Sequence, residues 1–114
     1  HRLPRQIPPR VATGLMLTGC PIDAARAYEL GLVNEVTTPD ALDAVTAAWA
    51  NDIVAAAPLS IASVRPCVAR GLGRPLSDAL PDSYPAEDRR AASRDSIEGP
   101  RAFAEKRAPQ WTGQ

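Results

Sequence analysis

The stretch Ser93-Arg-Asp-Ser-Ile-Glu-Gly-Pro-Arg-Ala-Phe-Ala-Glu-Lys-Arg-Ala-Pro-Gln-Trp-Thr-Gly113 carries the signals that decide how the end of this chain folds. Asp95 and Glu98 lie three residues apart, which fits a helix N-cap with a reciprocal partner at the third helical position. Pro109 is a helix stop. The pattern therefore predicts one short helix that begins at Asp95 and ends before Pro109.

The predicted helix carries an aromatic ring and positive charge on one face. Phe103 precedes Lys106 by three residues and Arg107 by four, and residues at these spacings are neighbours on a helix surface. Such a face is suited to stacking on a base and binding a phosphate. The structural alternative is that Phe103 anchors a core while Lys106 is solvated.

The composition favours one small, mainly helical unit. A chain of 114 residues buries only about 65% of its unfolded surface. Aromatic residues make up 4%, so burial must come from aliphatic side chains on helices. Thirteen basic and thirteen acidic residues cancel, which argues against a chain-wide affinity for nucleic acid or an anionic membrane.

Metal, disulfide and membrane signals are absent from the sequence. Cys20 and Cys67 lie far apart, and His1 is the single histidine, so neither a zinc site nor a disulfide scaffold is indicated. No stretch approaches the roughly 20 apolar residues of a membrane span. No charged-then-apolar leader precedes the first expected helix. We therefore expect a cytoplasmic setting.

Prolines, glycines and capping residues divide the chain into five to seven helical pieces. Pro9 to Gly19 reads as a first helix, and Asp23 is a good N-cap for a second helix that Gly31 closes. The run 32–36, Leu-Val-Asn-Glu-Val, is the one strand-like segment. The longest helix begins near Thr38 and ends at Pro58.

The longest expected helix carries an apolar stripe at spacings of three and four residues, the pattern of one buried face. The stripe is Leu42, Val45, Trp49, Ile53 and Ala56. We assign Trp49 to packing. Beyond Pro58, Pro66 removes one backbone hydrogen bond and clashes with the carbonyl of Ala62, so we expect a kink or a break there.

Several separated motifs, in one fixed order from about Arg2 to Gly113, resemble the C-terminal part of the enoyl-CoA hydratase/isomerase family, also called the crotonase superfamily. They are Arg2-Leu-Pro-Arg5, Leu17-Thr-Gly19, Asp23-Ala-Ala-Arg-Ala27, Gly31-Leu-Val-Asn34, Ala57-Pro-Leu59 and Gly99-Pro-Arg-Ala-Phe-Ala-Glu-Lys-Arg107. The resemblance implies the mainly helical C-terminal region of the α/β crotonase fold. Residues 1–36 would end its core, with short helices and one short strand, and residues 37–114 would form a helical assembly region.

The resemblance also implies a function in acyl-CoA and fatty acid metabolism. In the family, the last helix supplies an aromatic residue and a lysine near the adenine and phosphates of coenzyme A, and Phe103 and Lys106 occupy those motif positions. The implied partners are acyl-CoA and either further copies of this chain, as a trimer or hexamer, or other crotonase subunits. A coenzyme A thioester would be the substrate, with no separate cofactor.

The chain offers no residues that fit the family's chemistry. Hydration of an enoyl thioester needs donors for the enolate oxygen and carboxyls that move protons. Every glutamate has a structural role available, so we assign no catalytic residue and expect the isolated chain to be inactive as a lyase or isomerase. The interpretation is thus the C-terminal portion of an enoyl-CoA hydratase family protein, without its catalytic half. The alternative is a truncated, non-enzymatic module that docks on full-length crotonase subunits.

Overall fold

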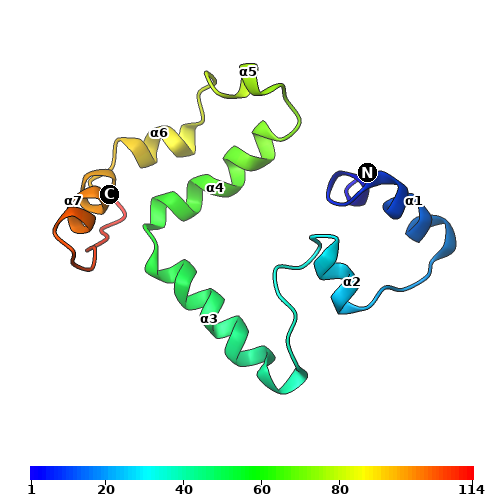
Figure 1. Cartoon of the computed structure of the whole chain (residues 1–114). Helices are drawn as coiled ribbons and strands as arrows, with labels where there is room; N and C mark the ends of the chain where they lie inside the picture. Colours follow the sequence, from blue (N-terminus) through cyan, green and yellow to red (C-terminus); the bar gives the residue numbers. More distant parts are fainter. The chain divides into compact units, whose positions relative to one another are not determined.

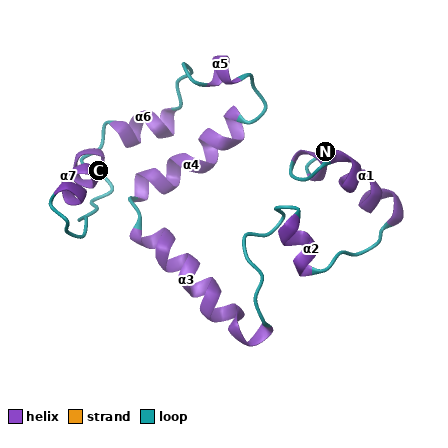
Figure 2. Cartoon of the chain, in the orientation of Figure 1, coloured by secondary structure: helices purple, strands orange, loops and turns teal.

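The computed structural model describes residues 1–114, and its regular elements are all helical (Figures 1 and 2). The elements in order are η1 (Leu3–Arg5), α1 (Pro9–Thr18), α2 (Ala24–Glu29), η2 (Pro39–Ala41), α3 (Leu42–Ala55), α4 (Pro58–Gly71), α5 (Leu76–Ala79), α6 (Pro85–Ala91) and α7 (Asp95–Ala104). Contacts between residues divide the chain into two compact units, His1–Val45 and Thr46–Gln114. The mainly helical fold class is as predicted.

The first unit contains the two helices whose ends were predicted from capping residues. α1 packs on η1, and Ile7 and Ala12 are buried. Gly19 ends α1 in the left-handed conformation, with φ of 64°. The Oδ1 atom of Asp23 accepts the N–H of Arg26 at 2.7 Å, which confirms Asp23 as the N-cap of α2.

The end of α2 is a Schellman motif with glycine at its left-handed position. The N–H of Leu32 donates to the carbonyl of Ala27 at 2.9 Å, and the N–H of Gly31 donates to the carbonyl of Tyr28 at 2.9 Å. Gly31 has φ of 73°. Glycine adopts this conformation with little conformational free energy cost because it has no Cβ.

The short strand predicted at residues 32–36 does not form. These residues are turn and coil, and the whole chain contains no strand (Figure 2). A strand needs a neighbouring strand to pair its N–H and C=O groups, and this chain offers none. The β-propensity of Leu32, Val33 and Val36 is therefore not expressed.

The apolar stripe of α3 is not buried, contrary to the prediction of a covered face. No residue of α3 is buried, and the exposed fractions of Leu42, Trp49 and Ile53 are 56%, 44% and 50%. The helical spacing was read correctly. No other segment of the 114 residues buries this face.

α4 runs through Pro66 as one helix, so of the predicted kink or break the break does not occur. Pro66 has no N–H for the carbonyl of Ala62, but the other hydrogen bonds of α4 keep the helix continuous. α6 lies along α4 in the second unit (Figure 1). α4 is thus a continuous helix that lacks one backbone hydrogen bond.

The chain between α4 and α6 is held by aromatic and charged contacts. The hydroxyl of Tyr84 donates to the carbonyl of Ala79 at 3.1 Å. The guanidinium of Arg70 lies 5.3 Å from the centre of the Tyr84 ring and 3.0 Å from the carboxylate of Asp82, which also pairs with Arg74. These contacts fix the loops around α5.

Candidate functional site

α7 begins differently from the predicted capping box. Arg94 is the N-cap residue, makes no side-chain capping bond, and leaves Asp95 as the first helical residue. Asp95 is 5% exposed, and its carboxylate turns toward the end of the chain. Its Oδ1 accepts the amide N–H of Thr112 at 2.8 Å and the Thr112 hydroxyl at 3.0 Å, and its Oδ2 accepts the N–H of Gly113 at 2.9 Å.

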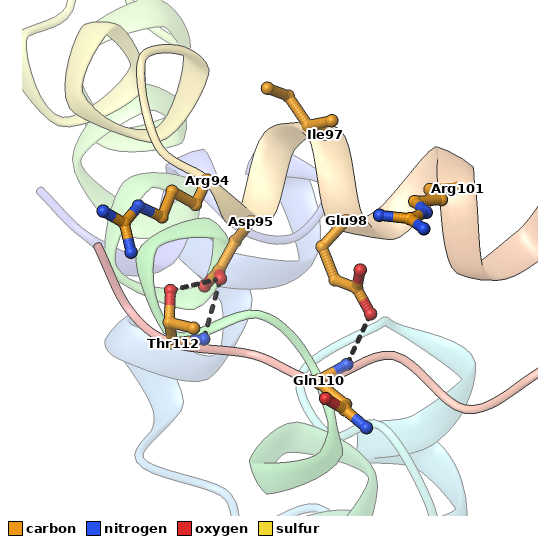
Figure 3. Close-up of a pocket in the computed structure, with 7 residues that line it drawn as sticks. All are labelled: Arg94, Asp95, Ile97, Glu98, Arg101, Gln110 and Thr112. Atoms are coloured by element: carbon orange, nitrogen blue, oxygen red, sulfur yellow. Dashed lines mark hydrogen bonds between the residues drawn. The ribbon is translucent and has the colours of Figure 1, made fainter.

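Glu98 also binds the chain end instead of the helix N-terminus. Its Oε1 accepts the N–H of Gln110 at 2.8 Å, and its two oxygens accept the Arg107 guanidinium at 2.6 and 3.0 Å. Figure 3 shows Asp95 and Glu98 one helical turn apart, facing the returning chain. We call residues 110–114 the strap.

The charges and amides around these carboxylates stabilise their ionised forms. The hydrogen bond from Arg107 is the main reason that the pKa of Glu98 is lowered to about 2, with the Gln110 amide as the next contributor. The backbone amide of Thr112 is the main cause of the lowered pKa of Asp95. Both side chains therefore act as anions that hold the strap.

Trp111 connects the strap to the junction between α3 and α4. Its indole N–H donates to the carbonyl of Ala55 at 2.8 Å. Its ring also covers Gly99 in α7, where an added Cβ would lie 3.3 Å from the ring. Trp111 thus makes its contacts within the chain.

α7 ends at Ala104, five residues before the predicted stop at Pro109. The end is a Schellman motif like that of α2. The N–H of Arg107 donates to the carbonyl of Ala102 at 3.1 Å, and the N–H of Lys106 donates to the carbonyl of Phe103 at 3.2 Å. Lys106 thus takes the left-handed position that Gly31 takes in α2, and it has φ of 53°.

This end separates the two predicted ligand contacts from a common helix face. Phe103 lies on the last turn of α7 and is 88% exposed, so it is no core anchor in this chain. Lys106 lies beyond the helix, is exposed, and makes no ion pair within the chain. Arg107, the second predicted cation, is already paired with Glu98 and Glu105.

A pocket of about 310 Å³ lies between α7 and the strap (Figure 3). Its lining residues are Arg94, Asp95, Ile97, Glu98, Arg101, Gln110 and Thr112. The Arg101 guanidinium pairs with Glu105 at 2.9 Å. The two carboxylates in the pocket, Asp95 and Glu98, accept hydrogen bonds from the strap. We therefore assign the pocket a structural role.

The structure also bears on a metal site and on a helix that could span a membrane. It brings together no group of three or more histidine, cysteine, aspartate or glutamate side chains able to hold a metal ion. No single helix is long and apolar enough to cross a membrane. Only residues Pro39–Ala55 taken together with Pro58–Gly71 meet that test, by length and composition, and this pair is bent by 104°.

The order of motifs and the helical fold agree with a family-wide comparison. The model of the enoyl-CoA hydratase/isomerase family matches residues 1–114, the whole chain. The chain belongs to the enoyl-CoA hydratase/isomerase family. This confirms the resemblance drawn from the sequence motifs.

Individual members of the enoyl-CoA hydratase/isomerase family are similar along the whole chain. A carnitinyl-CoA dehydratase of Citrobacter koseri is 37% identical over 121 residues, covering 99% of this chain and 45% of that protein. An (E)-benzylidenesuccinyl-CoA hydratase of Thauera aromatica is 37% identical over 111 residues, covering 97% of this chain and 43% of that protein.

Solved structures of the family show the same fold. An enoyl-CoA hydratase from Mycobacterium tuberculosis matches with a TM-score of 0.89 and 35% identity, over 99% of this chain and 45% of its own. An enoyl-CoA hydratase from Bacillus anthracis matches with a TM-score of 0.91 and 31% identity, over 100% of this chain and 44% of its own. The chain thus spans a little under half the length of the relatives it matches.

Proposed function

We propose that this chain serves coenzyme A binding and subunit assembly in an enoyl-CoA hydratase/isomerase family protein, as its C-terminal portion. Phe103 and Lys106 are assigned to the nucleotide part of coenzyme A. The two relatives described above are, by name, a dehydratase and a hydratase of CoA thioesters. An acyl-CoA ligand for this chain is in keeping with them.

The observation that carries the proposal is the backbone conformation of Lys106. It is the single non-glycine residue with positive φ in the chain. A residue with a Cβ in this conformation costs about 1–2 kcal/mol, and glycine fills the same position at the end of α2. Strained conformations of this kind persist only where the surrounding structure holds them, and they gather at ligand sites. Lys106 is also the only lysine in the sequence.

The charge of Lys106 suits a phosphate ligand at this position. A helix C-terminus carries partial negative charge, which by itself repels phosphate. Lys106 supplies a cation directly beyond the end of α7, and no carboxylate of the chain neutralises it. A charge-assisted bond to phosphate is among the stronger polar contacts that a side chain makes.

Phe103 supplies the matching contact for the base. Its ring is 88% exposed on the last turn of α7. Stacking of a base on an aromatic side chain contributes about 1–3 kcal/mol. Phe103 therefore lies in the last turn of α7, and Lys106 follows the end of the helix two residues after Ala104.

Subunit assembly is supported by how little of the chain is buried. The buried apolar residues are Ile7, Ala12, Ala57 and Ala102, and no large side chain is fully buried. The apolar side chains of Leu42, Trp49 and Ile53 in the α3 stripe are about half exposed. Apolar surface of this extent is characteristic of protein interfaces. We assign its cover to further copies of the same protein in a homo-oligomer.

We assign no proton-transfer role to the glutamates that the structure pairs. Glu29, Glu87, Glu98 and Glu105 each bind an arginine of the same chain. The paired arginines lower the pKa of Glu87, Glu98 and Glu105, which makes these carboxylates poor proton donors at neutral pH. The chain's part in the reaction is therefore to bind and hold the substrate.

The single lysine allows a direct test of ligand contact. The protein is treated with a limiting amine-acetylating reagent in the presence of coenzyme A, pantetheine or neither, and the sites are quantified by mass spectrometry. We expect coenzyme A to protect Lys106, and pantetheine, which lacks the nucleotide, to leave it reactive. The α-amino group is the internal control and should react equally in all samples. Equal acetylation of Lys106 with and without coenzyme A would overturn the assignment.

A further inference from the structure

The orientation of α7 depends on the strap more than on a buried face. Only Asp95 and Ala102 are buried in α7, and one of these two is the carboxylate that binds the strap. Ala102 is too small to fix the direction of a helix by packing alone. The chain end that returns along α7 must therefore supply the missing constraint.

The strap runs back along α7 and is bound at two successive positions. Glu98 accepts the amide of Gln110, and Asp95, one turn nearer the helix start, accepts the amides of Thr112 and Gly113. The carbonyl of Gln114 then accepts the N–H of Arg94 at 2.6 Å. Figure 3 shows the two carboxylates pointing to the same side of the helix, toward the strap.

The strap is also fixed to the end of α3. Trp111 donates to the carbonyl of Ala55 at 2.8 Å. Both residues belong to the second unit. The strap thus joins α7 to the junction between α3 and α4.

The turn that carries Lys106 lies between the helix and the strap. Arg107, the next residue, binds Glu98, and the strap begins three residues later. Movement of the strap would therefore displace the turn at residues 105–107 and with it the ammonium group of Lys106. Phe103, three residues before, would turn with α7.

We propose that Asp95 is a positioning residue for coenzyme A: it touches no ligand, and it holds the strap so that Phe103 and Lys106 keep their relative placement. This inference rests on the proposed coenzyme A contact. Asp95 has three hydrogen bonds to the strap and is 5% exposed. It makes the most strap contacts of any side chain on α7.

The test is a thermodynamic cycle between Asp95→Asn and Lys106→Ala. Asparagine replaces the Oδ2 acceptor of Asp95 by an NH₂ donor that faces the Gly113 N–H, so the strap loses a bond while side-chain volume is kept. The matched control is Asp52→Asn, an exposed α3 aspartate without a hydrogen bond in the structure. Affinities for coenzyme A and pantetheine are measured by calorimetry on the protein as purified, in the assembly it forms.

We expect Asp95→Asn to weaken coenzyme A binding about tenfold and to leave pantetheine binding unchanged. In the Lys106→Ala background, Asp95→Asn should have no further effect, because the contact it positions is already gone. A merely structural role would instead weaken both ligands, or add its full loss in both backgrounds. Either of those results overturns the positioning role.

The two proposals fail in different ways. If Lys106→Ala leaves coenzyme A affinity unchanged, the proposed contact is wrong and the positioning role falls with it. If Lys106→Ala weakens binding and Asp95→Asn does not, the contact stands and the positioning role is wrong. Should Asp95→Asn fail to fold, Thr112→Val removes only the 3.0 Å hydroxyl bond and Thr112→Ser restores it. The serine variant must then bind coenzyme A like the parent, and the valine variant more weakly.

Discussion

Asp95 and Thr112, 17 residues apart, are joined by two hydrogen bonds to the same carboxylate oxygen, one from the backbone amide and one from the hydroxyl. Together with Glu98 and Gln110, they turn the chain end into a strap on α7. A pair of acids at the start of a helix usually satisfies the helix's own N–H groups. Here the same pair satisfies the N–H groups of a distant segment.

The strap should respond to acid through Glu98. The pKa of Glu98 lies at about 2 in the folded protein, below its ordinary value of 4.5, so its contribution to stability is complete above pH 4.5 and is lost as the pH falls toward 2. We expect the amide resonance of Gln110 to titrate with a midpoint near pH 2 in ¹H–¹⁵N NMR spectra. In Glu98→Gln this titration should vanish. A midpoint near 4.5 in the parent would show that Arg107 does not hold Glu98.

Pro66 should cost stability because it interrupts the hydrogen bonds of α4 without ending the helix. Replacing an interior proline by alanine in a continuous helix gains up to about 3 kcal/mol. Pro66→Ala should therefore raise the midpoint of thermal unfolding, followed by circular dichroism. Pro58→Ala is the control, since Pro58 is the first residue of α4, where a missing N–H costs nothing. An unchanged midpoint for Pro66→Ala would mean that the helix is broken at this point in solution.

The α3 stripe should mediate assembly. We expect the 12.1 kDa chain to sediment as a larger species at micromolar concentration, and Ile53→Asp to shift the equilibrium toward the monomer. Burying an unpaired carboxylate at an interface is strongly unfavourable. The control, Asn51→Asp, places the same charge on the opposite side of α3 and should leave the assembly intact. Equal effects of both substitutions, or a monomeric parent, would contradict the proposed homo-oligomer.

Local sequence signals were sufficient where the structure is local. Asp23, Gly19 and Gly31 have the helix-capping roles predicted for them, because each acts on backbone groups within a few residues. The stripe of α3 has helical spacing, but its cover cannot be read from the helix itself. The run 32–36 was called a strand from propensity alone, although a strand exists only with a partner.

The candidate site was predicted in composition but not in geometry. Phe103 and Lys106 were predicted to contact coenzyme A, which stays a prediction, and both are exposed. The shared helix face was wrong because α7 ends at Ala104. The strap depends on contacts between residues 12 to 56 positions apart, which helix rules do not address. One signal pointed to it: Gly99 in the middle of a helix indicates a close neighbour, and the neighbour is Trp111.

The coenzyme A assignment is tested most directly by Lys106→Gly, which separates stability from binding. Glycine relieves the left-handed backbone at φ of 53°, so the variant should be more stable by about 1 kcal/mol. It also removes the ammonium group, so calorimetry should show coenzyme A binding weakened about tenfold to a hundredfold and pantetheine binding unchanged. A variant that is more stable and binds coenzyme A as tightly as the parent would contradict the account, because Lys106 would then hold a strained position without serving a ligand.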